Sequence, residues 1–196
     1  MTTRLVVLAS GNGSNFQAIL DATRTEPVLD AEVVGVVCNV PDAFVLTRAA
    51  AAGVHCEVVP AGRGEPRPDY DARLLDAVRT LKPDYVVLAG WMRLLSMSFL
   101  GAFPRRVINL HPALPGQYPG THAIERALDA AQRLGENRTG VMVHFVPDEG
   151  VDDGPVIATA QVEIRPDDTH ESLSERVHAA ERTLLVSALR TVIAQR

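Results

Sequence analysis

Short runs of β-branched residues alternate with helical patterns along the first half of this chain, and no other feature constrains its fold so strongly. Strands are predicted at Leu5 to Ala9, Glu32 to Cys38 and Tyr85 to Ala89, with a weaker candidate at His55 to Val59. From Leu74 to Leu81, apolar residues recur at helical spacing, and Pro83 ends that helix. Strands that alternate with helices pair in parallel through crossover connections. This order predicts an α/β fold with a mostly parallel, twisted sheet and helices on both faces.

The second half predicts a change of strand direction. A strand from Arg106 to Leu110 is followed by a helix from Thr121 to Leu134 and by two β-rich segments, at Gly140 to Val146 and Pro155 to Ile164. Their close spacing favours antiparallel C-terminal strands at the edge of the sheet. The last helix opens near Asp168 with a capping-type pattern, and its apolar face is expected to pack on the sheet.

Composition limits what such a chain can do. A length of 196 residues with 46% hydrophobic content suffices for one core, so residues 1–196 are expected to form one domain. The net charge of -5 argues against a broad basic surface for nucleic acid. The chain has neither the ~18-residue apolar run of a membrane span nor a secretory signal, so a cytoplasmic protein is expected. Cys38 and Cys56 lack disulfide or metal-site spacing and are predicted to be reduced, buried thiols.

A glycine-rich turn, Gly11 to Asn15, follows the first predicted strand and precedes a helical segment. Glycines let the backbone approach an anion, and the amides at a helix start attract it. A dinucleotide fingerprint does not fit, because Phe16 stands where a third glycine belongs and Cys38 and Asn39 where an acidic residue belongs. A Walker A ending is also missing. We expect a phosphate site, with a plain turn capped by Ser14 as the alternative.

Asn109 and His111 lie two residues apart at the end of a predicted strand, so their side chains point to the same side. An amide donor beside an imidazole can stabilise the oxyanion that forms when an amine attacks a carbonyl carbon. Asp152, in a carboxylate-rich turn, is the expected third partner, which would raise the pKa of His111 and keep it protonated at neutral pH. Taken singly, these residues also fit a structural histidine and a solvated turn.

Five sequence motifs occur in an order that is typical of one enzyme family. They are SGNGSN from Ser10, AGWMRLLS from Ala89, INLHPAL from Ile108, YPGTHAI from Tyr118 and VHFVPDEGVDDGPVI from Val143. Over nearly the whole chain they resemble the phosphoribosylglycinamide formyltransferase family. The resemblance implies a Rossmann-like formyltransferase fold that moves the formyl group of 10-formyltetrahydrofolate to the glycyl amine of glycinamide ribonucleotide in purine synthesis. It also implies a phosphate-binding half, residues 1–100, and a catalytic and folate-binding half, residues 101–196.

The resemblance assigns roles to individual residues. The ribonucleotide phosphate would be bound by Gly13, Ser14 and Asn15, and the ribose hydroxyls by Glu181. The folate would contact Arg67, Met92, Arg93, Leu94, Leu95, Asn109 and Asp148. Asn109 and His111 would polarise the formyl oxygen, and Asp152 would help to pass protons. His122 and His144 would line the pocket, and no metal is implied.

Two departures from the family pattern lie beside the expected site. Pro115 and Gly116 directly follow Leu114, where the family usually reads Leu-Leu-Pro, so the backbone of the 112–120 loop stays open. Asp153 adjoins Asp152 where many relatives have a small or polar residue. Successive side chains of an extended segment point opposite ways, so only one is expected to face the histidine. The D-x-G-P spacing favours Asp152.

Rival classes fit part of the pattern. Methionyl-tRNA formyltransferase shares the Asn-x-His-Pro site but needs a further domain and a basic surface, and formyltetrahydrofolate deformylase typically has a second histidine where Pro112 stands. The phosphate turn argues against a sugar-nucleotide N-formyltransferase, and the intact site argues against a non-catalytic phosphosugar-binding module. The expected partners are small-molecule substrates, without nucleic acid or membrane, and a homodimer stays open.

Overall fold

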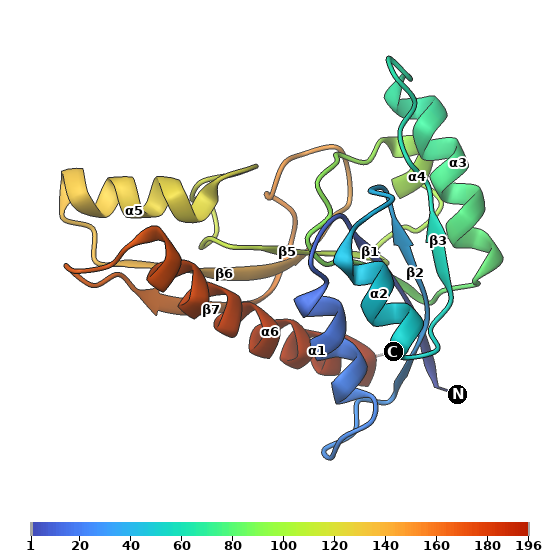
Figure 1. The fold of residues 1–196 in the computed structure, drawn as a ribbon, viewed down its shortest axis with the longest axis horizontal. Coiled ribbons are helices and arrows are strands. Elements are labelled where there is room, and N and C mark those ends of the chain that lie inside the picture. The colour runs from blue at the N-terminus through green and yellow to red at the C-terminus, as the bar shows by residue number, and fades with distance from the viewer. Residues whose placement is uncertain (1, 196) are drawn as a thin grey trace.

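A seven-stranded sheet forms the centre of the molecule, a computed structural model that describes residues 2–195 (Figure 1). Its strands are β1 (Thr3–Ala9), β2 (Ala31–Cys38), β3 (Cys56–Val58), β4 (Tyr85–Leu88), β5 (Val107–His111), β6 (Arg138–Phe145) and β7 (Val156–Glu163). The helices are α1 (Ser14–Ala22), α2 (Phe44–Ala51), α3 (Arg67–Thr80), α4 (Met97–Leu100), α5 (Ala123–Leu134) and α6 (His170–Ala194).

The strand order is β3-β2-β1-β4-β5-β6-β7. The first five strands in this order pair in parallel. β6 and β7 are antiparallel additions beside β5. The order β3-β2-β1-β4-β5 is that of a Rossmann-like sheet, whose ligands bind at the carboxyl ends of the strands. The predicted fold class is therefore confirmed.

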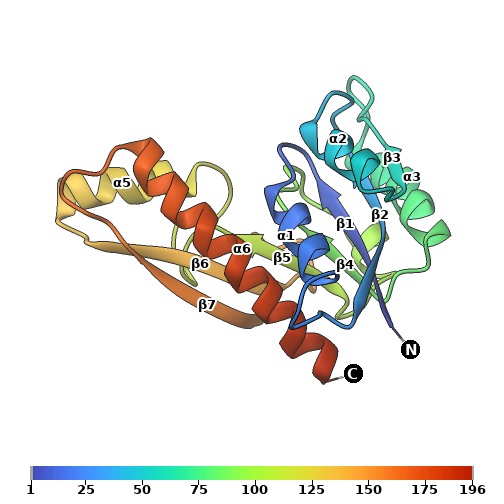
Figure 2. The same ribbon diagram turned by 60° about the horizontal axis from the view of Figure 1, so that its bottom comes forward.

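Helices cover both faces of the sheet because side chains alternate along each strand. In β1, Leu5 and Val7 belong to one hydrophobic core, and Val6 and Leu8 belong to the other. The first core lies under α1, α2, α5 and α6, and the second lies under α3 and α4. Figure 2 shows α6 crossing β6 and β7 and continuing beside α1.

Several elements differ from the sequence prediction. α2 was not predicted, because it buries only Val45 and Ala49 and so lacks a strong apolar period. α5 begins at Ala123 instead of Thr121, since His122 has a left-handed backbone with φ 59°. β5 continues through His111, which places this residue inside the strand end instead of just past it.

Other predictions hold. α6 starts with a capping box in which Thr169 and Ser172 cap each other's backbone amides. Cys38 and Cys56 are free thiols as predicted, but the prediction that both are buried is wrong for Cys56, which is half-buried. Between residues 2 and 195, none of the helices is long and apolar enough to cross a bilayer.

Candidate active site

Asn109, His111 and Asp152 meet at the carboxyl end of β5. Asn109 Nδ2 donates to Asp152 Oδ1 at 2.9 Å, and Asp152 Oδ2 lies 3.2 Å from His111 Nδ1. One carboxylate therefore contacts both side chains, with one oxygen for each. The expectation that Asn109 and His111 point to the same side agrees with this geometry.

Asp152 reaches the cluster from the loop between β6 and β7. A Cβ on Gly154 would lie 1.9 Å from the carbonyl oxygen of Phe145, so only glycine lets the chain turn back beside β6 here. Asp152 itself is left-handed, with φ 55°. The segment is therefore not extended at Asp152 as expected, but Asp152 is still the carboxylate that faces His111. Asp153 is exposed and packs against Gly150.

His144 belongs to this cluster instead of merely lining the pocket. β6 pairs with β5 so that His144 stands opposite Asn109. His144 Nε2 lies 3.2 Å from Asn109 Nδ2 and 3.6 Å from Asp152 Oδ1. His144 Nδ1 lies 2.8 Å from the carbonyl oxygen of Phe145, which can only accept, so Nδ1 carries a hydrogen. The sequence feature that could have indicated this role for His144 is its position inside an otherwise apolar strand.

Burial governs the charge of His111, which is 3% exposed. Burial lowers the pKa of His111 below its ordinary value. Asp152 opposes this effect, as does the carbonyl oxygen of Gln117, 3.4 Å from His111 Nε2, but neither compensates for it. The expectation that Asp152 keeps His111 protonated at neutral pH is therefore wrong for the free protein. A neutral imidazole is set to accept a proton.

Asp152 carries the charge of the cluster. Burial raises the pKa of Asp152, but the side chain of His144, the amide of Gly120 at 2.8 Å and the positive charge that His111 gains at acid pH together outweigh burial. The net effect lowers this pKa below its usual range. The carboxylate is consequently ionised at neutral pH and can stabilise a proton arriving on His111.

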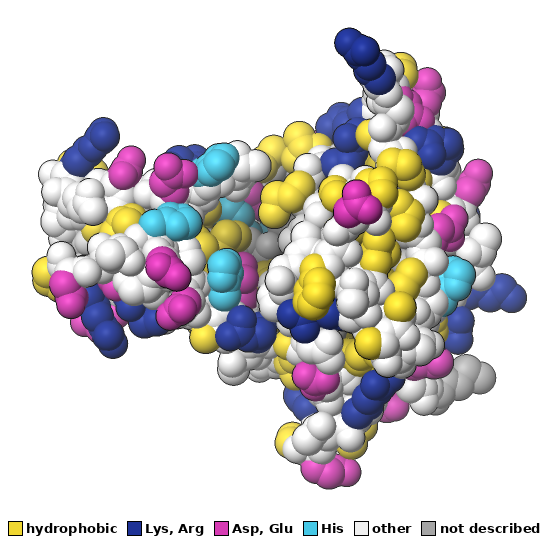
Figure 3. Space-filling model, viewed as in Figure 1, with side chains coloured by type: hydrophobic (Ala, Val, Ile, Leu, Met, Phe, Trp, Pro, Cys, Tyr) yellow, Lys and Arg dark blue, Asp and Glu magenta, His cyan; other side chains and the backbone are white. Residues whose placement is uncertain are grey.

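The cluster forms one wall of a cavity of about 500 Å³. In Figure 3, histidine side chains gather on the part of the molecule that carries α5, beside the hollow that faces the part that carries α1 to α4. Residues expected to contact folate line the cavity, namely Met92, Arg93, Leu94, Leu95, Asn109 and Asp148. Met92 and Leu94 are 68% and 50% exposed, which gives the cavity an apolar side. Within residues 2–195 no group of three or more His, Cys, Asp or Glu side chains is arranged to hold a metal ion.

Arg67, the remaining residue expected at the folate, is the first residue of α3 and does not line the cavity. It pairs with Glu149, which does line it. The other carboxylate oxygen of Glu149 accepts from the amide of Met97 at 2.9 Å. Glu149, which the sequence did not single out, thus joins the β6–β7 loop to α3 and α4.

The glycine turn after β1 brings together the residues expected at the ribonucleotide. Gly13 is the N-cap of α1 with φ 77°, and a Cβ there would lie 2.6 Å from Val45. Ser14 is the first helical residue, so the expected cap by Ser14 is wrong and Gly13 takes the N-cap position. Buried Asn15 donates from Nδ2 to Glu181 Oε2 at 3.3 Å. Burial raises the pKa of Glu181 to about 7, and the bond from Asn15 only partly opposes this.

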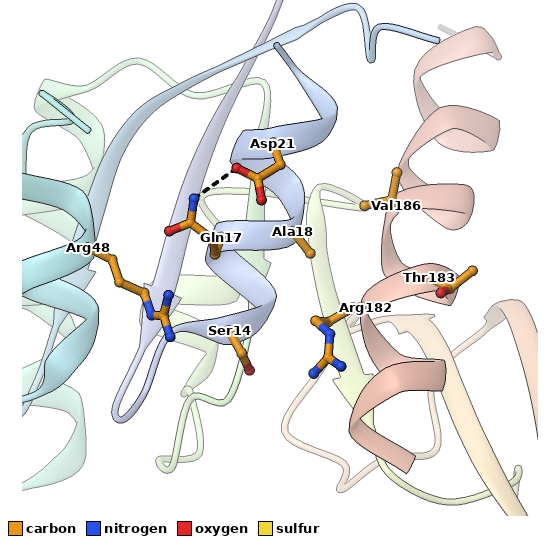
Figure 4. A pocket seen from close by; sticks show the side chains of 8 residues that line it. All are labelled: Ser14, Gln17, Ala18, Asp21, Arg48, Arg182, Thr183 and Val186. Carbon is orange, nitrogen blue, oxygen red and sulfur yellow. Dashed lines mark hydrogen bonds between the residues drawn. The ribbon is translucent and has the colours of Figure 1, made fainter. Parts of the chain in front are cut away.

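A second cavity, of about 560 Å³, lies beside the start of α1 and includes Ser14, Arg48 and Arg182. Figure 4 shows the two guanidinium groups on opposite sides of Ser14, one from α2 and one from α6. Arg48 also donates to the carbonyl and side-chain oxygens of Asn12, at 2.9 and 3.0 Å. Two cations at a helix start favour an anion. Neither arginine could be singled out from the sequence, because only the packing of α2 and α6 brings them to the turn.

Ser10 joins the glycine turn to the segment that follows β4. Its hydroxyl accepts from the amide of Met92 at 2.9 Å, and its own amide donates to the carbonyl of Gly90 at 3.0 Å. Only β4 separates β1 from β5, so the glycine turn and the His111 cluster begin roughly 10 Å apart at ordinary strand spacing. One small molecule can span that distance.

Comparisons with known proteins identify the family of this chain. The family model described as formyl transferase matches residues 3–189. Phosphoribosylglycinamide formyltransferase of Schizosaccharomyces pombe is 43% identical over 98% of this chain and 98% of its own length, and that of Escherichia coli is 41% identical over 92% and 82%. The solved structure of glycinamide ribonucleotide transformylase 1 from Symbiobacterium toebii has a TM-score of 0.92 at 37% identity, covering 100% of this chain and 89% of that one. The trifunctional purine biosynthetic protein adenosine-3 of Drosophila melanogaster is 42% identical, and the chain spans 14% of that longer protein. This chain belongs to the formyl transferase family.

Proposed function

We propose that the protein transfers the formyl group of 10-formyltetrahydrofolate to the glycyl amine of glycinamide ribonucleotide, in purine biosynthesis. The observation that carries the proposal is the Asp152 carboxylate, which contacts Asn109 and His111 at once on the wall of a ligand-sized cavity. In the reaction the amine nitrogen bonds to the formyl carbon, and the bond from that carbon to the donor nitrogen breaks. One proton passes from the amine to the donor nitrogen.

Asn109 and His111 would have different roles at the formyl group. One N–H of Asn109 would exchange its present partner for the formyl oxygen and stabilise the negative charge that develops there. Neutral His111 would accept the proton of the attacking amine, and Asp152 would stabilise the resulting imidazolium. His111 would then deliver the proton to the leaving nitrogen and end the cycle neutral.

The cavity has features that suit the folate donor. Met92 and Leu94 offer exposed apolar surface for a flat ring system. Buried Trp91 Nε1 and Arg93 Nε, in residues that line the cavity, have no hydrogen-bond partner among residues 2–195. Arg67 would give up its ion pair with Glu149 and bind a carboxylate of the donor instead.

The acceptor would lie farther along the same edge of the sheet, beside the glycine turn that follows β1. Its phosphate would bind the amides of Gly13 to Asn15, with Arg48 and Arg182 supplying positive charge, and Glu181 would meet the ribose. Loss of one charge-assisted contact typically costs about 1.5–3 kcal/mol, so an acceptor without its phosphate is expected to bind at least about tenfold more weakly.

The experiment supplies the protein with both substrates and follows tetrahydrofolate and the formylated ribotide by mass spectrometry. We expect tetrahydrofolate release only when glycinamide ribonucleotide is present, and a higher KM for the dephosphorylated acceptor. Release without any amine would identify a hydrolase. Turnover of an amino sugar nucleotide alone would identify the sugar-nucleotide class, and binding without turnover would identify a phosphosugar-binding module.

A further inference from the structure

We propose that Arg126 is a positioning residue for formyl transfer, because it holds the loop that presents Gln117 and Gly120 to the His111–Asp152 pair. The inference rests on the proposed function for its kinetic consequence. Its structural part stands on contacts alone.

The loop between β5 and α5 contacts both members of the pair. The amide of Gly120 donates to Asp152 Oδ2 at 2.8 Å, on the same oxygen that faces His111. The carbonyl oxygen of Gln117 lies 3.4 Å from the other ring nitrogen of His111. The loop thus sets both the orientation of the imidazole and the charge distribution on the carboxylate.

This loop is not a conformation that the chain adopts by itself. Gly116, Tyr118, Gly120 and His122 all have positive φ, of 77°, 46°, 81° and 59°. For the two residues that are not glycine, a left-handed backbone costs about 1–2 kcal/mol each. Such a backbone persists only where neighbouring groups hold it.

Arg126, a residue of α5, holds this loop in place. Its Nη2 donates to the carbonyl oxygens of Tyr118 and Pro119, at 2.5 and 2.7 Å, and its guanidinium lies 5.8 Å from the centre of the Tyr118 ring. The adjacent Ala127 is buried in the core, so the arginine projects from a fixed helix. The two carbonyls that it holds lie between Gln117 and Gly120 in the chain, so their position fixes both contacts with the catalytic pair.

The test compares Arg126→Ala with Arg126→Lys and with Arg133→Ala, a control that removes an exposed arginine two turns later on the same helix. Without the hydrogen bonds from Arg126 to the carbonyl oxygens of Tyr118 and Pro119, we expect faster hydrogen exchange at residues 116–121 and an altered NMR titration of His111. Both are measured without substrate. We also expect kcat to fall roughly ten- to a hundredfold, because small displacements of catalytic groups have effects of that size. KM for the acceptor should change less than about twofold, since the phosphate turn lies on other elements. Lysine should recover part of kcat, because its ammonium can still donate to at least one carbonyl.

Each result decides the inference. Wild-type exchange at residues 116–121 in Arg126→Ala would overturn it, as would faster exchange with unaltered kcat, or equal loss of kcat in Arg133→Ala. Should the alanine variant fold poorly, Arg126→Lys gives the same comparison at smaller amplitude. Exchange and titration need no turnover, so they test whether Arg126 holds the loop even if the wild-type protein does not formylate glycinamide ribonucleotide. Failure to formylate would contradict the proposed function instead.

Discussion

At the scale of single residues, Asp152 matters most because its two oxygens serve different partners. In Asp152→Asn one of those oxygens becomes an N–H donor and the charge is lost. We predict a fall in kcat on the order of a hundredfold, with little change in KM for either substrate. The pKa of His111 should fall further, because the carboxylate that opposes the effect of burial is gone. Steady-state kinetics and an NMR titration of the imidazole test this, and an effect confined to KM would contradict the assigned role.

Glu181 offers a test that needs no activity. Burial raises its pKa to about 7, against about 4.5 when unfolded, so between these pH values the folded state retains a proton that the unfolded state has released. Stability is therefore lost as the pH rises from about 4.5 to 7. Glu181→Gln removes this loss, and we predict that it stabilises the protein by roughly 1–3 kcal/mol at pH 8 but little at pH 4.5. Urea unfolding at both pH values measures it, and equal effects would refute the assigned burial penalty.

At the scale of elements, Gly154 sets the return of the chain from the Asp152 loop into β7. In Gly154→Ala the new methyl group would overlap the carbonyl of Phe145, so the β6–β7 joint must shift. We predict a loss of roughly 1–3 kcal/mol in stability, with kcat lowered because Asp152 moves away from His111. Gly11→Ala is the control for stability, since a Cβ there meets open space. Denaturant unfolding compares the two variants, and equal stability would contradict the close-approach argument.

How far the elements follow from sequence depends on the range of the forces that form them. The strands and α6 were predictable because their apolar periods and the Thr169 cap are local signals. α2 was not predictable, because its sequence lacks a strong apolar period and its formation depends on packing against other elements. Asn109 and His111 were recognisable from their spacing. The contact of His144 with them was not, because β-pairing register is set by the whole sheet.

The charge of His111 shows the same limit. A nearby carboxylate is visible as a motif and predicts a raised pKa. Burial depends on every element that covers the ring, and here burial prevails. The sequence thus indicated which side chains lie together, but it predicted a pKa shift of His111 opposite to the one that burial produces.

At the scale of the whole molecule, β4 places the glycine turn and the His111 cluster at the same edge of the sheet, and Ser10 joins the turn to the segment after β4. The glycine turn follows β1, the His111 cluster ends β5, and Asp152 comes from the antiparallel edge of the sheet. α2 and α6 bring Arg48 and Arg182 to the turn from opposite sides (Figure 4). No local segment contains this site, which exists only when the sheet and its helices have assembled.

The measurement that tests the account most directly is kcat for formylation of glycinamide ribonucleotide by Asn109→Ala, His111→Ala, Asp152→Asn and the triple variant. In the proposed mechanism the three side chains act on one formyl group through one carboxylate, so we predict that the triple variant is no slower than the slowest single variant, within about threefold. A triple variant whose loss equals the product of the three single losses would show independent contributions and contradict the account.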